Sequence, residues 1–167
     1  MGLSKAQLQR YKRHTVMKEI GIQGQEKICA AKVLIIGVGG IGSPTALYLA
    51  AAGVGTIGLA DGDKVDVSNL QRQIIHDTSD VGRLKTSSAK ERILAINPDV
   101  NVVTHETWVD DSNVANIIND YDFIIDGTDN FETRYLINDI CALQEKVFIS
   151  CSILINIIQL ILFRTEF

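Results

Sequence analysis

The sequence has 167 residues, which is enough for one ordinary domain and too few for two. Its 46% hydrophobic residues, 22% charged residues and two prolines exclude collagen-like, low-complexity and disordered chains. The 16 Lys and Arg residues against 20 Asp and Glu residues give a formal net charge of -4, which argues against a nucleic-acid or anionic-membrane surface.

The N-terminal residues predict helices. A basic, weakly amphipathic helix is expected over residues 4–20, with Gly21 as its stop, and a second short helix over residues 23–31. We therefore predict a helical arm over residues 1–31, followed by a single α/β domain over residues 32–167.

From residue 32 onward, short apolar runs alternate with helical segments. Strands are expected to begin at Lys32 and Val147 and to cover 56–61, 100–105 and 123–126, with helices over 42–52, 85–96, 112–118 and 131–144. Apolar strands joined by helical crossovers predict a Rossmann-like, mostly parallel sheet with helices on both faces. The polar segment 62–84 is interpreted as a functional loop, and the apolar run 147–163 as two buried strands rather than a membrane span.

Three cysteines, Cys29, Cys141 and Cys151, form no Cys-x-x-Cys pair, so neither a disulfide framework nor a zinc site is expected. We interpret them as buried or incidental thiols. Because the N-terminus also lacks the apolar core of a signal peptide, a cytoplasmic protein is expected.

A glycine-rich turn follows the first strand and opens a helix. Gly37, Gly39 and Gly42 form a G-x-G-x-x-G pattern, which lets a backbone and a helix N-terminus approach phosphate groups. Asp61 follows the second strand, 24 residues after Gly37, near the spacing of an acid that binds a ribose hydroxyl. These residues predict a nucleotide site but do not separate ATP from a nicotinamide or flavin cofactor; a structural turn and a loop carboxylate are the alternatives.

Charged residues expected at the same sheet edge favour ATP. Arg72 and Lys85 lie between the second strand and the next helix, where they can neutralise a polyphosphate. Asp129 follows the fourth strand and can hold Mg²⁺ directly or through water. The alternatives are surface ion pairs for the two cations and a helix N-cap for Asp129.

The histidines His14, His76 and His105 have no ligand-like spacing, and we interpret them as surface or loop residues. This favours a reaction that needs no general base, such as attack by an ionised carboxylate on the α-phosphate of ATP.

Several motifs occur together: RYKR at 10–13, GVGGIGSP at 37–44, the stretch 50–73, VGRLK ending at Lys85, INPDV, and DGTDNFETR at 126–134. With them the chain resembles the HesA/MoeB/ThiF family of ATP-dependent adenylyltransferases over nearly residues 11–146. The resemblance implies that ATP and Mg²⁺ are used to activate the C-terminal glycine carboxylate of a ubiquitin-fold sulfur carrier ending in Gly-Gly, in a molybdopterin-type or thiamine-type pathway.

The resemblance also implies roles for individual residues. The predicted nucleotide-binding residues are Gly37, Gly39, Gly40, Gly42, Asp61 (ribose), Asp63, Asn69, Arg72, Gln73, Lys85, Asp129 and Asn130. Asp129 would position Mg²⁺ and the acylating carboxylate. Arg13 resembles the family's N-terminal arginine that reaches into the neighbouring subunit's site, which implies a homodimer. The predicted catalytic residues are Arg13, Arg72, Lys85 and Asp129.

Family members continue with further strands, a crossover segment and, in many cases, paired Cys-x-x-Cys zinc motifs. We expect this chain to lack that C-terminal part of the fold. Two alternatives stay open: a non-catalytic nucleotide-binding relic that pairs with a full-length relative, and an NAD- or FAD-binding domain of an oxidoreductase.

Overall fold

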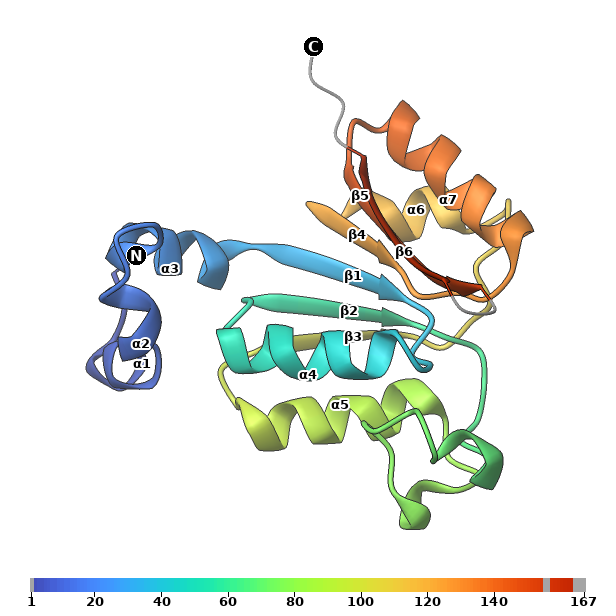
Figure 1. The fold of residues 1–167 in the computed structure, drawn as a ribbon, viewed down its shortest axis with the longest axis horizontal. Coiled ribbons are helices and arrows are strands. Elements are labelled where there is room, and N and C mark those ends of the chain that lie inside the picture. The colour runs from blue at the N-terminus through green and yellow to red at the C-terminus, as the bar shows by residue number, and fades with distance from the viewer. Residues whose placement is uncertain (1, 155–156, 164–167) are drawn as a thin grey trace.

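The computed structural model describes residues 2–154 and 157–163 around a six-stranded sheet of order β3-β2-β1-β4-β5-β6 (Figure 1). The strands are Lys32–Ile36 (β1), Thr56–Ala60 (β2), Asn101–His105 (β3), Phe123–Asp126 (β4), Val147–Leu154 (β5) and Ile157–Phe163 (β6). Strands β1 to β5 run parallel, and β6 pairs antiparallel with β5. The predicted mostly parallel sheet is confirmed. Residues 155–156 and 164–167 of the predicted domain lie outside the described residues.

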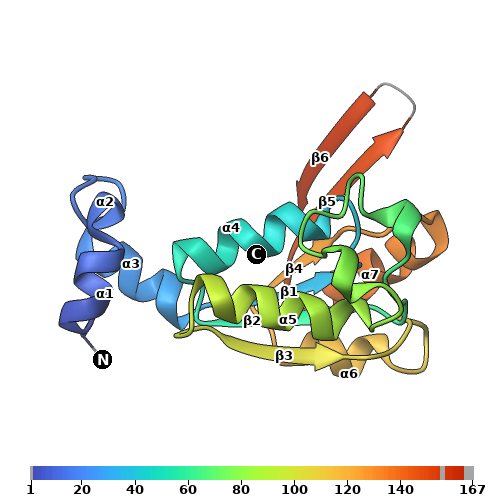
Figure 2. The ribbon, with the colours of Figure 1, turned by 90° about the horizontal axis from the view of Figure 1, so that it is seen from below.

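Helices cover both faces of this sheet, as predicted (Figures 1 and 2). Helices Gly42–Ala52 (α4) and Lys85–Ile96 (α5) pack on one face, and Val114–Asn119 (α6) and Phe131–Leu143 (α7) pack on the other. Successive strand residues point to opposite faces, so Ile35 of β1 joins the core under α4 and α5 while Leu34 joins the core under α6 and α7. Burial on both sides explains why the strands read as continuous apolar runs.

The predicted single helix over 4–20 is wrong. The chain forms Lys5–Arg10 (α1) and Lys12–Thr15 (α2) there, whereas the second helix expected over 23–31 is present as Gly21–Ala30 (α3). Tyr11 separates the first two because its side chain is buried: an added Cβ at Gly53 would lie 2.4 Å from the Tyr11 ring, and the Tyr11 hydroxyl accepts a hydrogen bond from Asn97 Nδ2 at 2.9 Å. The helix is therefore interrupted at Tyr11, because the Tyr11 ring packs on the sheet domain.

The polar segment between β2 and α5 forms a loop, as predicted. Two short 3-10 turns, Val67–Asn69 (η1) and Thr78–Asp80 (η2), lie within it. Each turn begins after an aspartate, Asp66 or Asp77, whose carboxylate accepts the backbone N–H two residues on, at 2.8 Å in both turns. These caps give the loop a defined path along the carboxyl edge of the sheet.

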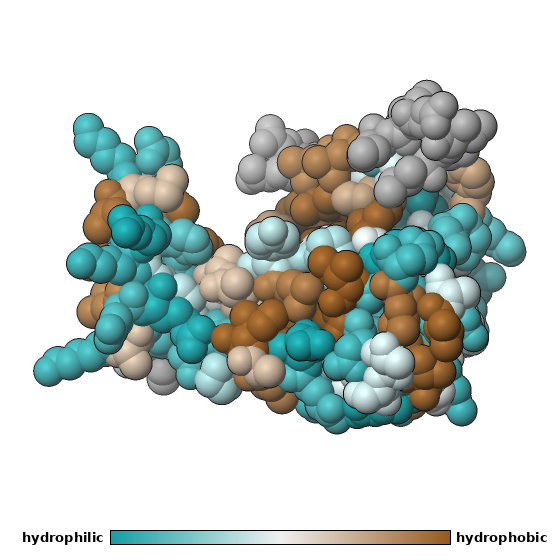
Figure 3. Space-filling model, turned by 60° about the horizontal axis from the view of Figure 1, so that its bottom comes forward, coloured by the Kyte–Doolittle hydropathy of each residue, from teal (hydrophilic) through white to brown (hydrophobic). Residues whose placement is uncertain are grey.

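The apolar run at the end forms two strands, but the prediction that both are buried is wrong. Leu160 and Leu162 of β6 are 70% and 63% exposed, whereas Phe148 of β5 is buried. The reason is that β6 lies at the edge of the sheet, beyond the helices, and apolar side chains gather on the surface there (Figure 3). In the described ranges, no helix is both long and apolar enough to cross a membrane.

Candidate functional site

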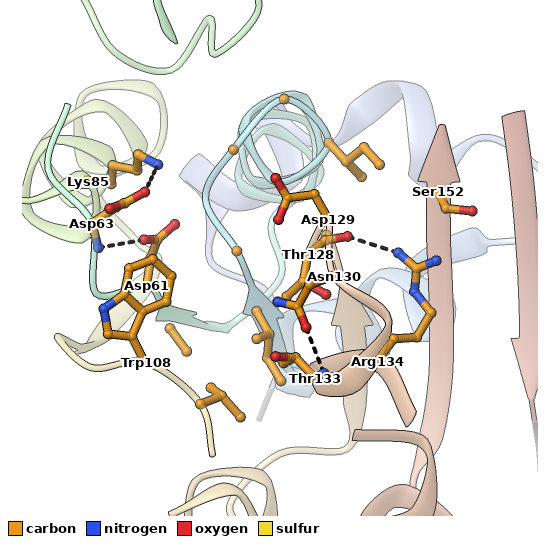
Figure 4. A pocket seen from close by; sticks show the side chains of 18 of the residues that line it. Asp61, Asp63, Lys85, Trp108, Thr128, Asp129, Asn130, Thr133, Arg134 and Ser152 are labelled. Carbon is orange, nitrogen blue, oxygen red and sulfur yellow. Dashed lines mark hydrogen bonds and ion pairs between the residues drawn. The ribbon is translucent and has the colours of Figure 1, made fainter. Parts of the chain in front are cut away.

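A cavity of about 580 Å³ opens at the carboxyl edge of the sheet (Figure 4). Parallel strands bring the loops that follow them to one edge, and here the loops after β1 to β4 all contribute, together with Ser152 of β5. The wall includes Gly37, Gly39, Gly40, Asp61, Asp63, Arg72, Gln73, Lys85, Trp108, Asp129, Asn130, Arg134 and Ser152. Segments that are distant in sequence therefore meet in one hollow.

The glycine turn forms the centre of this wall. Gly37 has a φ of +87°, which favours glycine, and its N–H donates to the carbonyl of Ala60 at 2.8 Å. An added Cβ at Gly42 would lie only 2.0 Å from the Gly37 carbonyl oxygen, so the first turn of α4 packs directly on the loop. Gly42 itself does not line the cavity; it allows this close approach, with the N-terminus of α4 behind the turn.

Asp61 holds the glycine turn and the next loop together. Its Oδ2 accepts the backbone N–H of Val38 and its Oδ1 accepts that of Asp63, both at 2.8 Å. A carboxylate has about four lone-pair sites, so these two bonds leave acceptor capacity for a hydroxyl in the cavity. The side chain is nearly buried, which fixes its direction.

The two predicted cations both line the cavity. Lys85 Nζ pairs with Asp63 Oδ2 at 2.8 Å, and only 7% of the Lys85 side chain is exposed, so this is not the surface ion pair of the alternative interpretation. The Arg72 stem covers the glycine turn, because an added Cβ at Gly40 would lie 3.5 Å from its Cγ and Cδ. The cavity thus holds two positive charges beside the turn.

Gln73 and Asn69 come from the same loop but differ in position. Gln73 Nε2 would lie 3.7 Å from a Cβ at Gly39, and its Oε1 is buried with no hydrogen-bond partner among the described residues. Asn69 does not line the cavity; its Oδ1 accepts the N–H of Asp66 at 3.2 Å and so caps η1.

The loop after β4 places Asp129 at the cavity, where it is exposed. The N-cap of α7 is Asn130, whose Oδ1 accepts the N–H of Thr133 at 2.8 Å, so the N-cap alternative for Asp129 is wrong. Across residues 2–154 and 157–163, no group of three or more His, Cys, Asp or Glu side chains forms a metal site. A single carboxylate such as Asp129 is the kind of protein ligand that Mg²⁺ takes where phosphates and water supply the other oxygen ligands.

Sequence reasoning missed the pair formed by Asp126 and Arg134. Asp126 is fully buried, and its Oδ2 accepts from Arg134 Nε at 2.8 Å and from Ser150 Oγ at 3.1 Å. Arg134 Nη2 also donates to the Thr128 carbonyl at 2.9 Å, which fixes the loop that carries Asp129. The sequence could have indicated this pair, because a carboxylate ends β4 and an arginine follows one helical turn into α7.

Arg13 lies away from this cavity. It is exposed on α2, in the arm formed by the N-terminal helices, at the opposite end of β1 from the glycine turn (Figure 1). The position of Arg13 within one chain does not test its predicted role in the site of a neighbouring subunit, which stays a prediction.

His76 lies on the loop between β2 and α5, within the prediction of a surface or loop residue, but it is buried, with only 5% of the residue exposed. Its Nδ1 lies 2.8 Å from Ser88 Oγ and its Nε2 3.4 Å from the Val38 carbonyl, so it packs behind the glycine turn. Burial lowers the pKa of His76. His105 is half-buried with Nε2 2.8 Å from the Tyr121 hydroxyl, and burial lowers its pKa as well.

Two of the three cysteine side chains, Cys141 and Cys151, do not have the properties of nucleophiles. Burial raises the pKa of the Cys141 thiol to about 12, and that of Cys151 is raised for the same reason. Cys29 is half-buried and accepts a hydrogen bond from Gln25 Nε2 at 3.6 Å. Since the thiolate is the reactive form, the raised values favour inert thiols at 141 and 151.

Fold and cavity together define the class of Rossmann-like α/β domains with a phosphate-type glycine turn. A model of the ThiF family matches residues 11–163, and the chain belongs to this family. It is 52% identical over 151 residues to the probable adenylyltransferase/sulfurtransferase MoeZ of Mycobacterium tuberculosis, a match that covers 90% of this chain and 38% of that protein. It is 49% identical over 147 residues to a probable molybdopterin-synthase adenylyltransferase of Gracilaria tenuistipitata, covering 88% of this chain and 41% of the relative.

Solved structures agree with the fold. The Escherichia coli tRNA N6-threonylcarbamoyladenosine dehydratase TcdA, in complex with AMP, superposes with a TM-score of 0.84 at 30% identity over 90% of this chain and 61% of that one. E. coli MccB with ATP gives a TM-score of 0.80 at 29% identity, covering 84% of this chain and 42% of that one. The chain spans only about two fifths of the length of the curated relatives described above.

Proposed function

We propose that this chain is the nucleotide-binding part of an ATP-dependent adenylyltransferase that activates the C-terminal glycine carboxylate of a ubiquitin-fold sulfur carrier. The observation that carries the proposal is that Arg72, Lys85 and Asp129 line the same cavity as the glycine turn. A hydride-transfer site needs no such set of charges, whereas a triphosphate does.

Different residues of the cavity would bind different parts of the nucleotide. In this proposal the backbone of Gly37, Gly39 and Gly40 and the N-terminus of α4, which Gly42 brings close, hold phosphate oxygens, and Asp61 accepts from a ribose hydroxyl. Arg72 and Lys85 offset the negative charge of the phosphates. Asp63, Gln73 and Asn130 complete the wall, and Asn69 acts through the backbone of the loop that carries Arg72, since its carbonyl accepts the Arg72 N–H at 3.1 Å.

The reaction requires little proton chemistry. An ionised carboxylate oxygen attacks the α-phosphorus, a phosphorus–oxygen bond forms to the carboxyl group, and the bond to the β-phosphate oxygen breaks to release pyrophosphate. The protein contributes positioning and charge neutralisation, which are the main terms in phosphoryl and nucleotidyl transfer. In this proposal, Arg72 and Lys85 offset the charge that accumulates on the departing phosphates.

Magnesium belongs to the same proposal. Asp129 would hold Mg²⁺ together with phosphate oxygens and water, and the ion would neutralise charge on the phosphates during transfer. The Asp126–Arg134 pair keeps the loop of Asp129 in place through the Thr128 carbonyl.

The assembly and location are also proposals. We propose a homodimer in which Arg13 of one protomer reaches the nucleotide site of its partner, because Arg13 is exposed on an arm far from its own cavity. The substrate protein of this homodimer would be the sulfur carrier that ends in Gly-Gly. The three free thiols favour a reducing, cytoplasmic compartment.

The test is ATP–pyrophosphate exchange with a Gly-Gly-ended carrier, alongside calorimetric ATP binding. Arg72→Ala should weaken ATP binding or exchange by about 1.5–3 kcal/mol, the value of a charge-assisted contact. Arg92→Ala is the matched control, because Arg92 forms only an exposed ion pair with Asp77 at 3.3 Å. Equal ATP binding and exchange in Arg72→Ala and wild type would refute the role of Arg72.

The same assays separate the alternative functions. ATP binding without exchange in the wild-type chain would favour a non-catalytic nucleotide-binding relic. Thermal stabilisation by NAD but not by ATP with Mg²⁺ would favour a domain of an oxidoreductase.

A further inference from the structure

One exposed aromatic side chain in the cavity is not used by the mechanism above. Trp108, on the loop after β3, is 64% exposed and lines the cavity next to Asp61 (Figure 4). It is the only tryptophan of the chain. A large apolar ring left open to solvent in a cavity wall is a common mark of a binding surface.

The tryptophan ring is held against the loop that follows β2. An added Cβ at Gly62 would lie 2.8 Å from Trp108 Cδ1 and Nε1, so only a glycine at this position allows the ring to lie there. On the other side, the Trp108 carbonyl accepts from Asn113 Nδ2 at 2.8 Å and from Thr107 Oγ1 at 3.1 Å. The backbone is thereby anchored to the start of α6, and the ring lies against Gly62 at the cavity wall.

The order of the strands decides which part of a nucleotide faces this ring. Along the sheet edge, the glycine turn follows β1, Asp61 follows β2, and Trp108 lies after β3. A nucleotide is a linear molecule in which the ribose stands between phosphates and base. If phosphates lie at the β1 turn and the ribose at Asp61, the base extends toward β3.

We propose that Trp108 is the residue on which the purine base of the bound nucleotide stacks. This inference rests on the proposed function, since it takes a nucleotide in this cavity as given. Any base can stack on an aromatic side chain, but a ligand without a base cannot. Trp108 should therefore contribute to the affinity for a nucleotide and not to the affinity for a bare polyphosphate.

The other exposed aromatic of the cavity is poorly placed for this role. Phe131 follows β4, on the far side of the glycine turn from Asp61. Its ring is already engaged, with the Arg134 guanidinium 5.5 Å from its centroid and the Tyr135 ring stacked at 6.5 Å.

The experiment uses the single tryptophan as its own reporter. ATP with Mg²⁺ should quench the fluorescence of the 167-residue chain, whereas inorganic tripolyphosphate with Mg²⁺ should bind without quenching. By calorimetry, Trp108→Ala should raise the Kd for ATP by about 5- to 150-fold, the range measured for loss of one stacked base, with the Kd for tripolyphosphate unchanged. Trp108→Phe should recover most of the ATP affinity. Tyr48→Ala removes a 77% exposed aromatic of α4 that does not line the cavity, and it should leave both Kd values unchanged.

The outcomes separate the two proposals. If wild-type protein binds ATP but Trp108→Ala binds it equally well, the stacking role is wrong and the nucleotide site stands. If Trp108→Ala weakens ATP and tripolyphosphate by the same factor, the ring acts through the fold and the stacking role is again wrong. If the wild-type chain binds no ATP, the proposed function itself fails.

Discussion

Replacing Arg134 with methionine tests how the β4 loop is stabilised. The Asp126 carboxylate is fully buried and receives four hydrogen bonds: Arg134 Nε, the N–H and Oγ1 of Thr128, and Ser150 Oγ. Arg134→Met removes the charged donor and the bond to the Thr128 carbonyl. Breaking a buried ion pair costs about 3–5 kcal/mol, and three neutral donors remain, so we expect a loss near the lower limit, about 3 kcal/mol.

Urea unfolding of a pair of variants measures this loss. In the double variant Asp126→Asn/Arg134→Met no charge is buried: the amide oxygen can still accept from Thr128, and the amide nitrogen can donate to Ser150 Oγ. The double variant should therefore be more stable than Arg134→Met alone by about 1–2 kcal/mol. A loss below about 1 kcal/mol for Arg134→Met, or a double variant less stable than the single one, would refute the reasoning.

Two further predictions concern residues around the glycine turn. Burial lowers the pKa of His76, so below about pH 6.5 the unfolded chain binds more protons than the folded one, and stability falls as the pH drops. In His76→Gln, the fall in Tm between pH 7.5 and pH 5.5 should be smaller than in wild type, and an equal fall would exclude His76 as its source. Gly42→Ala places a Cβ 2.0 Å from the Gly37 carbonyl oxygen and should lower the unfolding free energy by about 3 kcal/mol. Gly40→Ala meets only the flexible Arg72 stem at 3.5 Å and should change it by less than about 1 kcal/mol; similar losses in both variants would contradict the packing argument.

The sheet, its helices and most of the cavity wall could be predicted because they depend on local patterns. Apolar runs of strand length alternate with helical segments, and every carboxyl end of a parallel strand faces the same edge. These patterns predict that Asp61, Arg72, Lys85 and Asp129 lie at one edge, and all four line one cavity in the structure.

The features that the sequence predicted wrongly or did not predict have a common physical origin, since each depends on contacts between residues far apart in sequence. Tyr11 interrupts a helical pattern because its ring finds space beneath Gly53. His76 is buried because the glycine turn folds over it, and β6 exposes Leu160 and Leu162 because no described helix covers that edge of the sheet.

The amino-acid sequence alone determined the alternation of strands and helices, the glycine turn, and the charges that follow β2 and β4, because these depend on side-chain period and on turn chemistry. Only the tertiary structure decided which residues pair with these charges, Asp63 with Lys85 and Arg134 with Asp126. It also decided that the uncharged Trp108 ring lies against Gly62. Such pairs form because folding brings residues of different structural elements into contact, so their spacing in the sequence does not determine them.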